Sequence, residues 1–599
     1  MRTICRLAFM VFVAATFAQA ATTVDIYPGA DIPSVVAANP AGTTFVIYPG
    51  TYRVGTITPK TGDSFIGSTA CAPPKTSCPA ILNGSRLLTS FQTTGTYYYV
   101  TGQTQNNAVT VPSSKCQPMN PGYPLAYPGC IYPEDLYFDG TPLVHVTSLS
   151  AVGTGTWYFD YATDTIYFYD NPSGHTVEAS VVQSAFSYGP ANNVTIEYLT
   201  VEKYATPIMG GAIGGIPIGY FGSPTTGANW IVKYNEIALN HADGVVVNFG
   251  WRVLYNYIYQ NGDLGIGGGV GGGNSDGSGT LSSNVLIQGN EIAYNNFAHV
   301  SPHYGAGGAK MLVTRNVEFR GNYTHNNQGS GFHADTYNYG FLYDNNTSAD
   351  NTEQGIFHEV SYNAVARNNK LLRNGYIHPN LSFWLYGANL LSSTSQGMTA
   401  YCNTVEVSAQ GGNGIDIIGQ VRTETTIPEN NYFHHNTVVF DGNSGVTGAA
   451  RDSSTLTNFF NVNHFDYNTY HMPDVTRKAF AWNSKWYDFA GFQGEGQDVH
   501  GSADADYQAS IPVVSITSPT DQSSVTGTVA VASTATDPAS ISKVEFYVDW
   551  TLATTKTAAP YTFSWNTTPV AAGSHVITAM AVSSNGTQAC YAVTLNVTH

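Results

Sequence analysis

Short apolar segments recur along most of this chain, and an asparagine follows each of them. The units that begin at Asn322, Asn345 and Asn369 are 23 and 24 residues apart, and other units are longer by about 10 residues. A period in the low twenties with asparagine-punctuated apolar segments is typical of a solenoid. Asparagine suits a tight corner because it tolerates left-handed dihedral angles and bonds to neighbouring backbone. We therefore predict an all-β fold, a right-handed, single-stranded parallel β-helix over residues 21–511.

Two stretches depart from this period. Residues 155–160 and 165–169 are rich in aromatic and β-branched residues and flank a short turn, which predicts a β-hairpin insertion at about 130–185. From about residue 512 alternating segments such as 544–548 and 575–579 predict a C-terminal β-sandwich over 512–599. This module resembles bacterial immunoglobulin-like (Ig-like) domains through Ser518-Pro519, Pro560-Tyr561 and Trp565. The resemblance implies an accessory or spacer domain.

The N-terminal segment is typical of an export signal. Arg2 and Arg6 precede a short apolar run, and Ala18-Gln19-Ala20 fits a cleavage site, so we predict a signal peptide over 1–20 and a secreted protein, extracellular or periplasmic. No later stretch reaches the roughly 20 apolar residues of a membrane span. The net charge of −17 argues against a nucleic-acid partner and disfavours polyanionic glycans.

Six cysteines remain after the predicted signal peptide, and export permits disulfides. Cys71 with Cys78, and Cys116 with Cys130, are close enough in sequence to pair. Cys402 and Cys590 are far apart, and we expect both to stay free and buried. No C-x-x-C motif occurs, so no metal site and no cofactor are predicted from the cysteines.

Two neighbouring units carry the candidate chemistry. Asp335 and Glu359 each follow a glycine by four residues and are 24 residues apart, which is one rung. Successive strand residues alternate between faces and parallel strands stack about 4.8 Å apart, so both carboxylates should lie on one outer face roughly 5 Å apart. Retaining glycosidases hold their carboxyl pair at about 5–5.5 Å. Mutual repulsion should leave one carboxyl protonated and the other ionised.

Four further residues are candidates for substrate binding. Lys310 precedes the pair by about one rung, and His333 shares the outer face with Asp335. Phe357 and Trp384 offer apolar surfaces for sugar rings, with ordinary packing as the alternative. The loops 296–306 and 376–396 interrupt the period on either side, where binding sites are often built. A structural calcium ion between the carboxylates, or two solvated acids, are the alternatives to catalysis.

The motifs Gly307-Gly308-Ala309-Lys310, Gly331-x-x-x-Asp335 and Gly355-Ile356-x-x-Glu359 resemble a group of secreted bacterial proteins with the pectate-lyase-like fold. Their nearest functional kin are β-helix glycosidases of the β-xylosidase kind. That resemblance implies that Asp335 is the nucleophile and Glu359 the acid/base. The motif sets of polygalacturonases, pectate lyases and alginate epimerases are absent.

Three hypotheses follow. The first is a secreted retaining glycoside hydrolase acting on a neutral polysaccharide or oligosaccharide. The second is a polysaccharide lyase or epimerase, which arginine and lysine beside the carboxylates would favour. The third is a non-enzymatic glycan-binding or adhesin-like protein, which a flat outer face would favour. Fold alone does not separate them.

Overall fold

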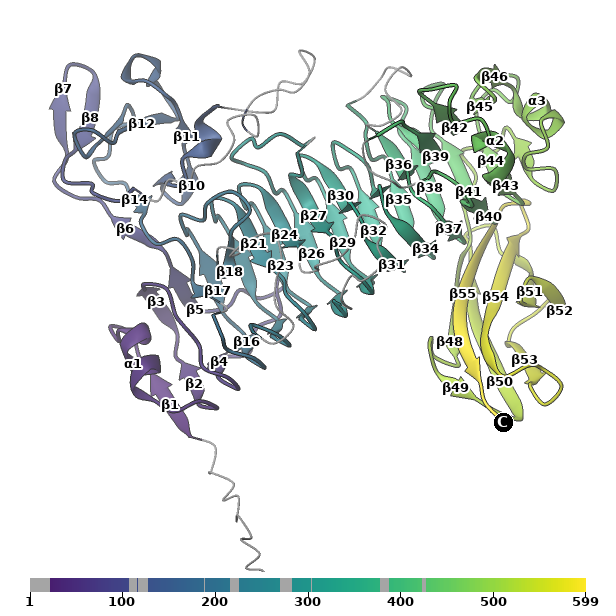
Figure 1. Ribbon diagram of the computed structural model, residues 1–599, viewed down its shortest axis with the longest axis horizontal. Helices are drawn as coiled ribbons and strands as arrows, with labels where there is room; N and C mark the ends of the chain where they lie inside the picture. Colours follow the sequence, from purple (N-terminus) through teal and green to yellow (C-terminus); the bar gives the residue numbers. More distant parts are fainter. Residues whose placement is uncertain are drawn as a thin grey trace, which may run out of the picture.

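The computed structural model describes residues 22–106, 116, 128–187, 189–215, 226–269, 283–302, 304–377, 387–422 and 427–599. The predicted signal peptide and Trp384 lie outside them. The described chain winds as a parallel β-helix (Figure 1). Its strands stack along the helix axis and form three long sheets, A, B and C.

From β16 to β45 each turn of the helix contributes one strand to each sheet, and β46 pairs antiparallel with β45 at the end of sheet C. Sheet A contains β1 (Thr23–Ile26), β2 (Thr44–Ile47), β4 (Ser64–Gly67), β16 (Thr195–Glu197), β19 (Ile231–Lys233), β22 (Arg252–Leu254), β25 (Val285–Gln288), β28 (Val317–Arg320), β31 (Tyr339–Asp344), β34 (Tyr362–Arg367), β37 (Thr399–Tyr401), β40 (Tyr432–His434) and β43 (His464–Asp466). Sheet B contains β3 (Gly50–Arg53), β5 (Ala80–Asn83), β17 (Thr200–Glu202), β20 (Glu236–Ala238), β23 (Tyr257–Tyr259), β26 (Glu291–Ala293), β29 (Tyr323–His325), β32 (Thr347–Ala349), β35 (Lys370–Leu372), β38 (Thr404–Val407), β41 (Thr437–Phe440), β44 (Thr469–His471) and β47 (Ser502–Asp504). Sheet C contains β15 (Phe186–Ser187), β18 (Gly211–Gly214), β21 (Asp243–Val246), β24 (Leu264–Gly269), β27 (Gly307–Leu312), β30 (Ser330–Asp335), β33 (Ile356–Glu359), β36 (Ala388–Ser393), β39 (Asn413–Gly419), β42 (Thr447–Arg451), β45 (Phe480–Trp482) and β46 (Lys485–Tyr487).

The core runs the length of the helix as rows of stacked apolar side chains. In sheet A one row continues through Val253, Ile287 and Phe319, which are register partners and fully buried. Burying one such side chain contributes about 1.5–3 kcal/mol. Helix α1 (Ile32–Ala38) packs Ile32 and Val36 on the first rungs, and Phe492 of α3 (Phe489–Gly494) packs on Phe465 and Phe480 near the last. A short α2 (Phe459–Val462) precedes β43.

Buried asparagines form two ladders at the corners of the helix. At the corner between sheets A and B each side-chain amide donates to the asparagine oxygen of the next rung, at 2.8–3.1 Å. This ladder passes through Asn322, Asn346 and Asn369, so the repeat is aligned on Asn346 and not on its neighbour Asn345. A second ladder, which the repeat analysis did not reveal, joins sheets B and C through Asn295, Asn327 and neighbouring rungs.

An antiparallel subdomain interrupts the early rungs. Its strands form two small sheets and comprise β6 (Ser85–Leu87), β7 (Gln92–Thr94), β8 (Tyr97–Val100), β9 (Leu136–Phe138), β10 (Thr141–Pro142), β11 (Val144–His145), β12 (Thr156–Asp160), β13 (Thr165–Phe168) and β14 (Val177–Ser180). The hairpin pairs β12 with β13. Because β8 pairs with β13 and β6 with β14, the subdomain begins near residue 85, earlier than the insertion at about 130–185 that we predicted.

A two-sheet sandwich follows the helix. It contains β48 (Val513–Ser518), β49 (Ser524–Val525), β50 (Thr528–Thr536), β51 (Ile541–Val548), β52 (Thr551–Lys556), β53 (Tyr561–Asn566), β54 (Gly573–Ser583) and β55 (Gln588–Val597). Val531, Phe546 and Leu595 are fully buried between its sheets. Figure 1 shows the sandwich beside the last rungs and the antiparallel subdomain at the other end of the helix. None of the described helices is long and apolar enough to cross a membrane.

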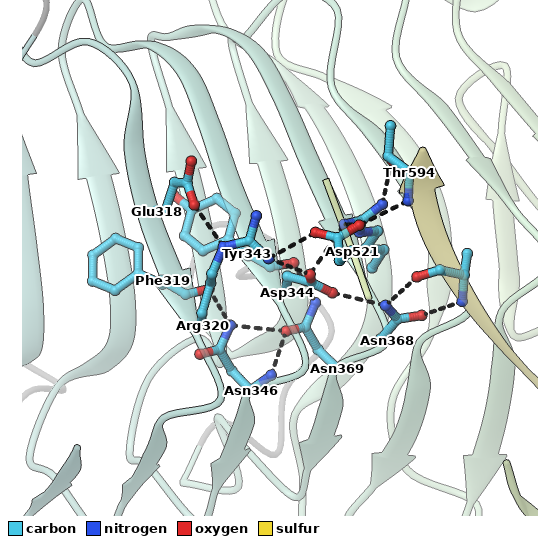
Figure 2. Close-up of polar contacts among 12 residues, drawn as sticks. Glu318, Phe319, Arg320, Tyr343, Asp344, Asn346, Asn368, Asn369, Asp521 and Thr594 are labelled. Carbon is cyan, nitrogen blue, oxygen red and sulfur yellow. Dashed lines mark hydrogen bonds and ion pairs between the residues drawn. The ribbon is translucent and has the colours of Figure 1, made fainter. Parts of the chain in front are cut away.

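The sandwich is fastened to the side of the helix by an ion network. Arg320 and Arg367 each contact both Asp344 and Asp521, at 2.7–3.1 Å (Figure 2). Asp521 belongs to the sandwich and the other three to the ends of β28, β31 and β34. The Arg367 and Asp344 side chains are only 2% and 6% exposed. Two cations alternate with two carboxylates in this ring, and Glu318, whose side chain is 35% exposed, is a third carboxylate bonded to Arg320.

Alternate residues of β55 complete this interface. Thr594 accepts from Arg367, the main chain of Ala592 exchanges two hydrogen bonds with the Asn368 amide, and Cys590 forms a disulfide with Cys402. Gln588 then reaches Thr437 and Thr469. Strand β55 therefore crosses successive rungs.

The cysteine predictions have two outcomes. The predicted Cys71–Cys78 and Cys116–Cys130 disulfides are confirmed. The expectation that Cys402 and Cys590 stay free was wrong, because the winding of the helix and the docking of the sandwich bring their Cα atoms to 4.9 Å, where they form a disulfide.

We predict that the Cys402–Cys590 disulfide contributes more to stability than Cys71–Cys78. It joins residues 188 apart, whereas Cys71 and Cys78 are 7 apart, and a cross-link removes more chain entropy when it closes a longer loop. The Cys402→Ala/Cys590→Ala variant should lose about 2–4 kcal/mol of unfolding free energy. The matched Cys71→Ala/Cys78→Ala variant should lose less. Denaturant unfolding without reductant measures both, and equal losses would contradict the prediction.

Candidate functional site

The candidate residues gather on the outer face of sheet C. Strands β27, β30 and β33 are neighbours in that sheet, and Asp335 is the register partner of Glu359. Phe332, Ala334 and Ile356 point into the core and are fully buried. Because strand residues alternate, the two carboxylates face outward on adjacent rungs. One oxygen of each lies within 4.8 Å of the other.

Asp335 is held as a carboxylate by its neighbours. The Lys310 ammonium lies 2.9 Å from Oδ2, and the Thr336 hydroxyl donates to Oδ1 at 2.8 Å. Burial opposes the charge, but Lys310, the His333 ring once it is protonated in acid, and these hydrogen bonds outweigh it and hold the pKa of Asp335 well below its usual range. Asp335 is therefore ionised, and its side chain is 17% exposed.

Glu359 contacts two nitrogen groups. His333 Nε2 lies 3.0 Å from one of its oxygens, and the guanidinium of Arg422 bonds to the other. Burial and then the charge of Lys310 lower the pKa of His333, so its imidazole is neutral at neutral pH. A neutral ring with its proton on Nε2 donates to Glu359.

The remaining predicted residues have different surroundings. The Phe357 ring stacks on His333 with centroids 4.3 Å apart, and it packs with Ala388, Leu391 and Ile418 in a buried apolar cluster. Phe357 thus supports the imidazole and does not present an open face to a sugar. Lys310 Nζ also donates to the carbonyl of Tyr304 at 2.9 Å, which ties the loop 296–306 to the site.

Two contact residues were missed by the sequence analysis. Thr336 directly follows Asp335 and was not considered. Arg422 lies in the irregular segment after β39, two rungs beyond Glu359, and no periodic pattern places it there.

A calcium ion does not suit this donor set. His333, Asp335 and Glu359 could offer one ligand atom each. Calcium takes six to eight oxygen ligands, whereas here one donor is an imidazole nitrogen and each carboxylate already bears a cationic side chain. The cluster of two cations and two carboxylates is balanced without a metal.

The comparisons with known proteins define the class. Residues 223–405 match the family model described as "Right handed beta helix region", and residues 512–579 match "Bacterial Ig domain". With its three parallel sheets, the chain is a right-handed parallel β-helix protein with a C-terminal Ig-like domain, and the predicted fold class is confirmed. A search of the curated proteins found no match.

Three solved structures are similar to parts of the chain. The A-module of the mannuronan C-5 epimerase AlgE6 of Azotobacter vinelandii is 11% identical, with 79% of this chain and 92% of that chain covered and a TM-score of 0.42. The family 28 exopolygalacturonase of Yersinia enterocolitica is 10% identical, with coverage of 78% and 77% and a TM-score of 0.26. The fibronectin(III)-like modules of Clostridium thermocellum CbhA are 26% identical, with coverage of 14% and 96% and a TM-score of 0.13. Likeness at this level transfers no activity.

We predict that Lys310 is the main cause of the low pKa of Asp335, so that Asp335 stays ionised in more acidic solution than an ordinary aspartate. The pKa of Asp335 is lowered in the folded protein, so the pair contributes stability above about pH 4 and loses it as the pH falls through the lowered pKa. The Lys310→Met variant lacks the cation that lowers the pKa of Asp335, while burial still raises it. The pKa of Asp335 should therefore rise by about 1 unit or more. Carbon-detected NMR titration of the aspartates measures this shift. Lys233→Met, which removes a lysine paired with Glu197 on sheet A, should leave Asp335 unchanged.

Proposed function

We propose that the chain is a secreted carbohydrate-active enzyme that hydrolyses a neutral glycan with retention of configuration. The observation that carries the proposal is the pair of register-matched, outward-facing carboxylates, Asp335 and Glu359, each held by its own cation. Like charges on adjacent strands destabilise a sheet unless cations offset them, so two scarce cations placed on this pair favour a functional role. Three disulfides support an oxidising compartment.

The electrostatics support a neutral substrate. Lys310 and Arg422 balance Asp335 and Glu359, so the site has no excess positive charge, and the whole chain carries −17. A polyanionic chain would be repelled at long range, whereas a neutral sugar would not. Tyr304 bonds to Lys310 and Arg422 bonds to Glu359, so two irregular segments contribute to the site, which argues against a flat adhesive face.

In the proposed reaction the ionised Asp335 attacks the anomeric carbon. Its oxygen forms a bond to that carbon while the glycosidic C–O bond breaks. Glu359, which first takes up a proton from solvent as it releases Arg422, gives that proton to the leaving oxygen. For this transfer the guanidinium of Arg422 must move away, and the leaving oxygen must then lie against the Glu359 oxygen that Arg422 contacts. In the second half, Glu359 removes a proton from water, the water oxygen bonds to the anomeric carbon, and Asp335 leaves as a carboxylate that Lys310 stabilises.

The test is isosteric neutralisation of each carboxylate. Asp335→Asn should lower kcat on natural glycans by about four orders of magnitude or more. Glu359→Gln should be nearly as damaging on natural glycans but should spare aryl glycosides with good leaving groups, which need little protonation. Glu291→Gln, which changes an outward carboxylate on sheet B, is the matched control. Full activity of either folded site variant would refute its role.

A polysaccharide lyase or epimerase is the second candidate, because Lys310 and Arg422 lie beside the carboxylates with a neutral imidazole between them. In that reaction the cations would bind a uronate carboxylate, and His333 would take the proton from the adjacent carbon. In a lyase the glycosidic bond then breaks as a C–C double bond forms.

Arg422→Gln separates the two candidates. A lyase should lose at least about tenfold in kcat/KM on a polyuronate, since the variant removes a charge-assisted contact with the uronate carboxylate. A neutral-glycan hydrolase should lose less than this. Ultraviolet absorbance reports the unsaturated lyase product, and new reducing ends without that absorbance report hydrolysis. Arg373→Gln, an arginine paired with Asp350 and Glu406 outside the site, is the control.

A further inference from the structure

One buried histidine is among the contacts that join the antiparallel subdomain to the helix, beside the Tyr137–Leu239 hydrogen bond and the ion pairs of Glu178. His241 lies just before β21 and is 2% exposed. Its Nδ1 is 3.1 Å from an oxygen of Asp135, and its Nε2 is 3.0 Å from the carbonyl oxygen of Cys130. Asp135 and Cys130 both belong to the segment that leads into β9. The imidazole therefore bridges two acceptors of the subdomain.

This geometry requires an additional proton. A neutral imidazole donates through one nitrogen only, and neither a carboxylate nor a carbonyl donates in return. Burial disfavours the cation, but Asp135 and the Cys130 carbonyl outweigh it and raise the pKa of His241. The pair is satisfied when the imidazolium faces the carboxylate.

The other groups around His241 are acidic or neutral. Glu134 adds a favourable charge and accepts a hydrogen bond from Tyr161. Burial and then the charge of His241 lower the pKa of His145 to about 3, so that ring is neutral. Tyr137 lies 3.4 Å from Asp135. Among the described residues around His241, none of these contacts supplies a competing cation.

The same subdomain packs on the loop that holds Lys310. Cys116 and Cys130 form a buried apolar cluster with Val300 and Ala306 of the loop 296–306. The loop is also close to the backbone of His241, because Gly262 lies between them. A Cβ atom added at Gly262 would be 1.7 Å from the His241 carbonyl oxygen and 3.0 Å from the Cβ atom of Ala298 in the loop. The loop in turn fixes Lys310 through the Tyr304 carbonyl.

We infer that His241 is a positioning residue: its proton docks the segment 128–135 of the antiparallel subdomain against the loop 296–306, and the docked loop holds Lys310 on Asp335. The consequence for turnover rests on the proposed function, but docking itself does not. The pKa of His241 is raised in the folded protein, so docking is complete below about pH 6.5 and is lost as the pH rises through the raised value.

The experiment follows hydrogen exchange by mass spectrometry in the full-length protein between pH 6 and 10, after correction for intrinsic exchange. In the wild type, segments 128–135 and 296–306 should lose protection together as the pH rises, by at least about tenfold. Asp135→Asn removes the carboxylate that holds the imidazolium, so both transitions should move down by about 1 pH unit or more. Asp139→Asn, which disrupts the exposed His175–Asp139 pair of the same subdomain, should leave them in place.

Each outcome decides the inference. Joint loss that shifts in Asp135→Asn supports it, and on the proposed substrate kcat should fall over the same pH range. No pH-dependent loss in the wild type refutes the role of the proton, whatever the variant does. Loss in 128–135 alone refutes the link to Lys310. If exchange behaves as expected while no glycan is turned over, the proposed function fails and the docking stands.

Discussion

The stacking of one rung on the next, held by two ladders of buried asparagine amides, is the constraint on which the other features depend. Each amide nitrogen donates to the asparagine oxygen of the following rung, so the ladder fixes which residues are neighbours across a sheet. A slip of one residue would exchange the two faces of a strand. Asp335 and Glu359 would then point into the apolar core, where an unpaired charge is very costly. The alignment of the carboxylates is thus a property of the whole helix.

The repeat in the sequence was sufficient for the fold and for the adjacency of Asp335 and Glu359, because a spacing of 24 residues equals one rung. It misplaced the ladder at Asn345, since two consecutive asparagines fit the pattern equally well. The repeat could not predict the contact of Arg422 with Glu359 or the Cys402–Cys590 disulfide. Both depend on how an irregular segment or a second domain folds back, and spacing along the chain carries no information about that.

Cationic side chains are scarce in this protein, with 23 lysines and arginines against 40 acidic residues. Several of them lie where carboxylates are buried. Lys310 and Arg422 balance the candidate site, and Arg320 and Arg367 balance the sandwich interface. Removing one partner from such a pair leaves the other charge uncompensated, which is costlier than losing an exposed ion pair. The distribution of these few cations therefore shows where the acidic chain tolerates buried negative charge.

The path of β55 across the rungs has a mechanical consequence. Its contacts to Arg367, Asn368, Cys402 and Thr469 lie one after another along the helix axis. A force pulling the sandwich along this strand would load these contacts in parallel, in shear, with a covalent bond among them. A force perpendicular to the strand would instead peel the contacts one by one until it reached the disulfide. The protein should therefore resist tension along its own axis far better than tension directed away from it.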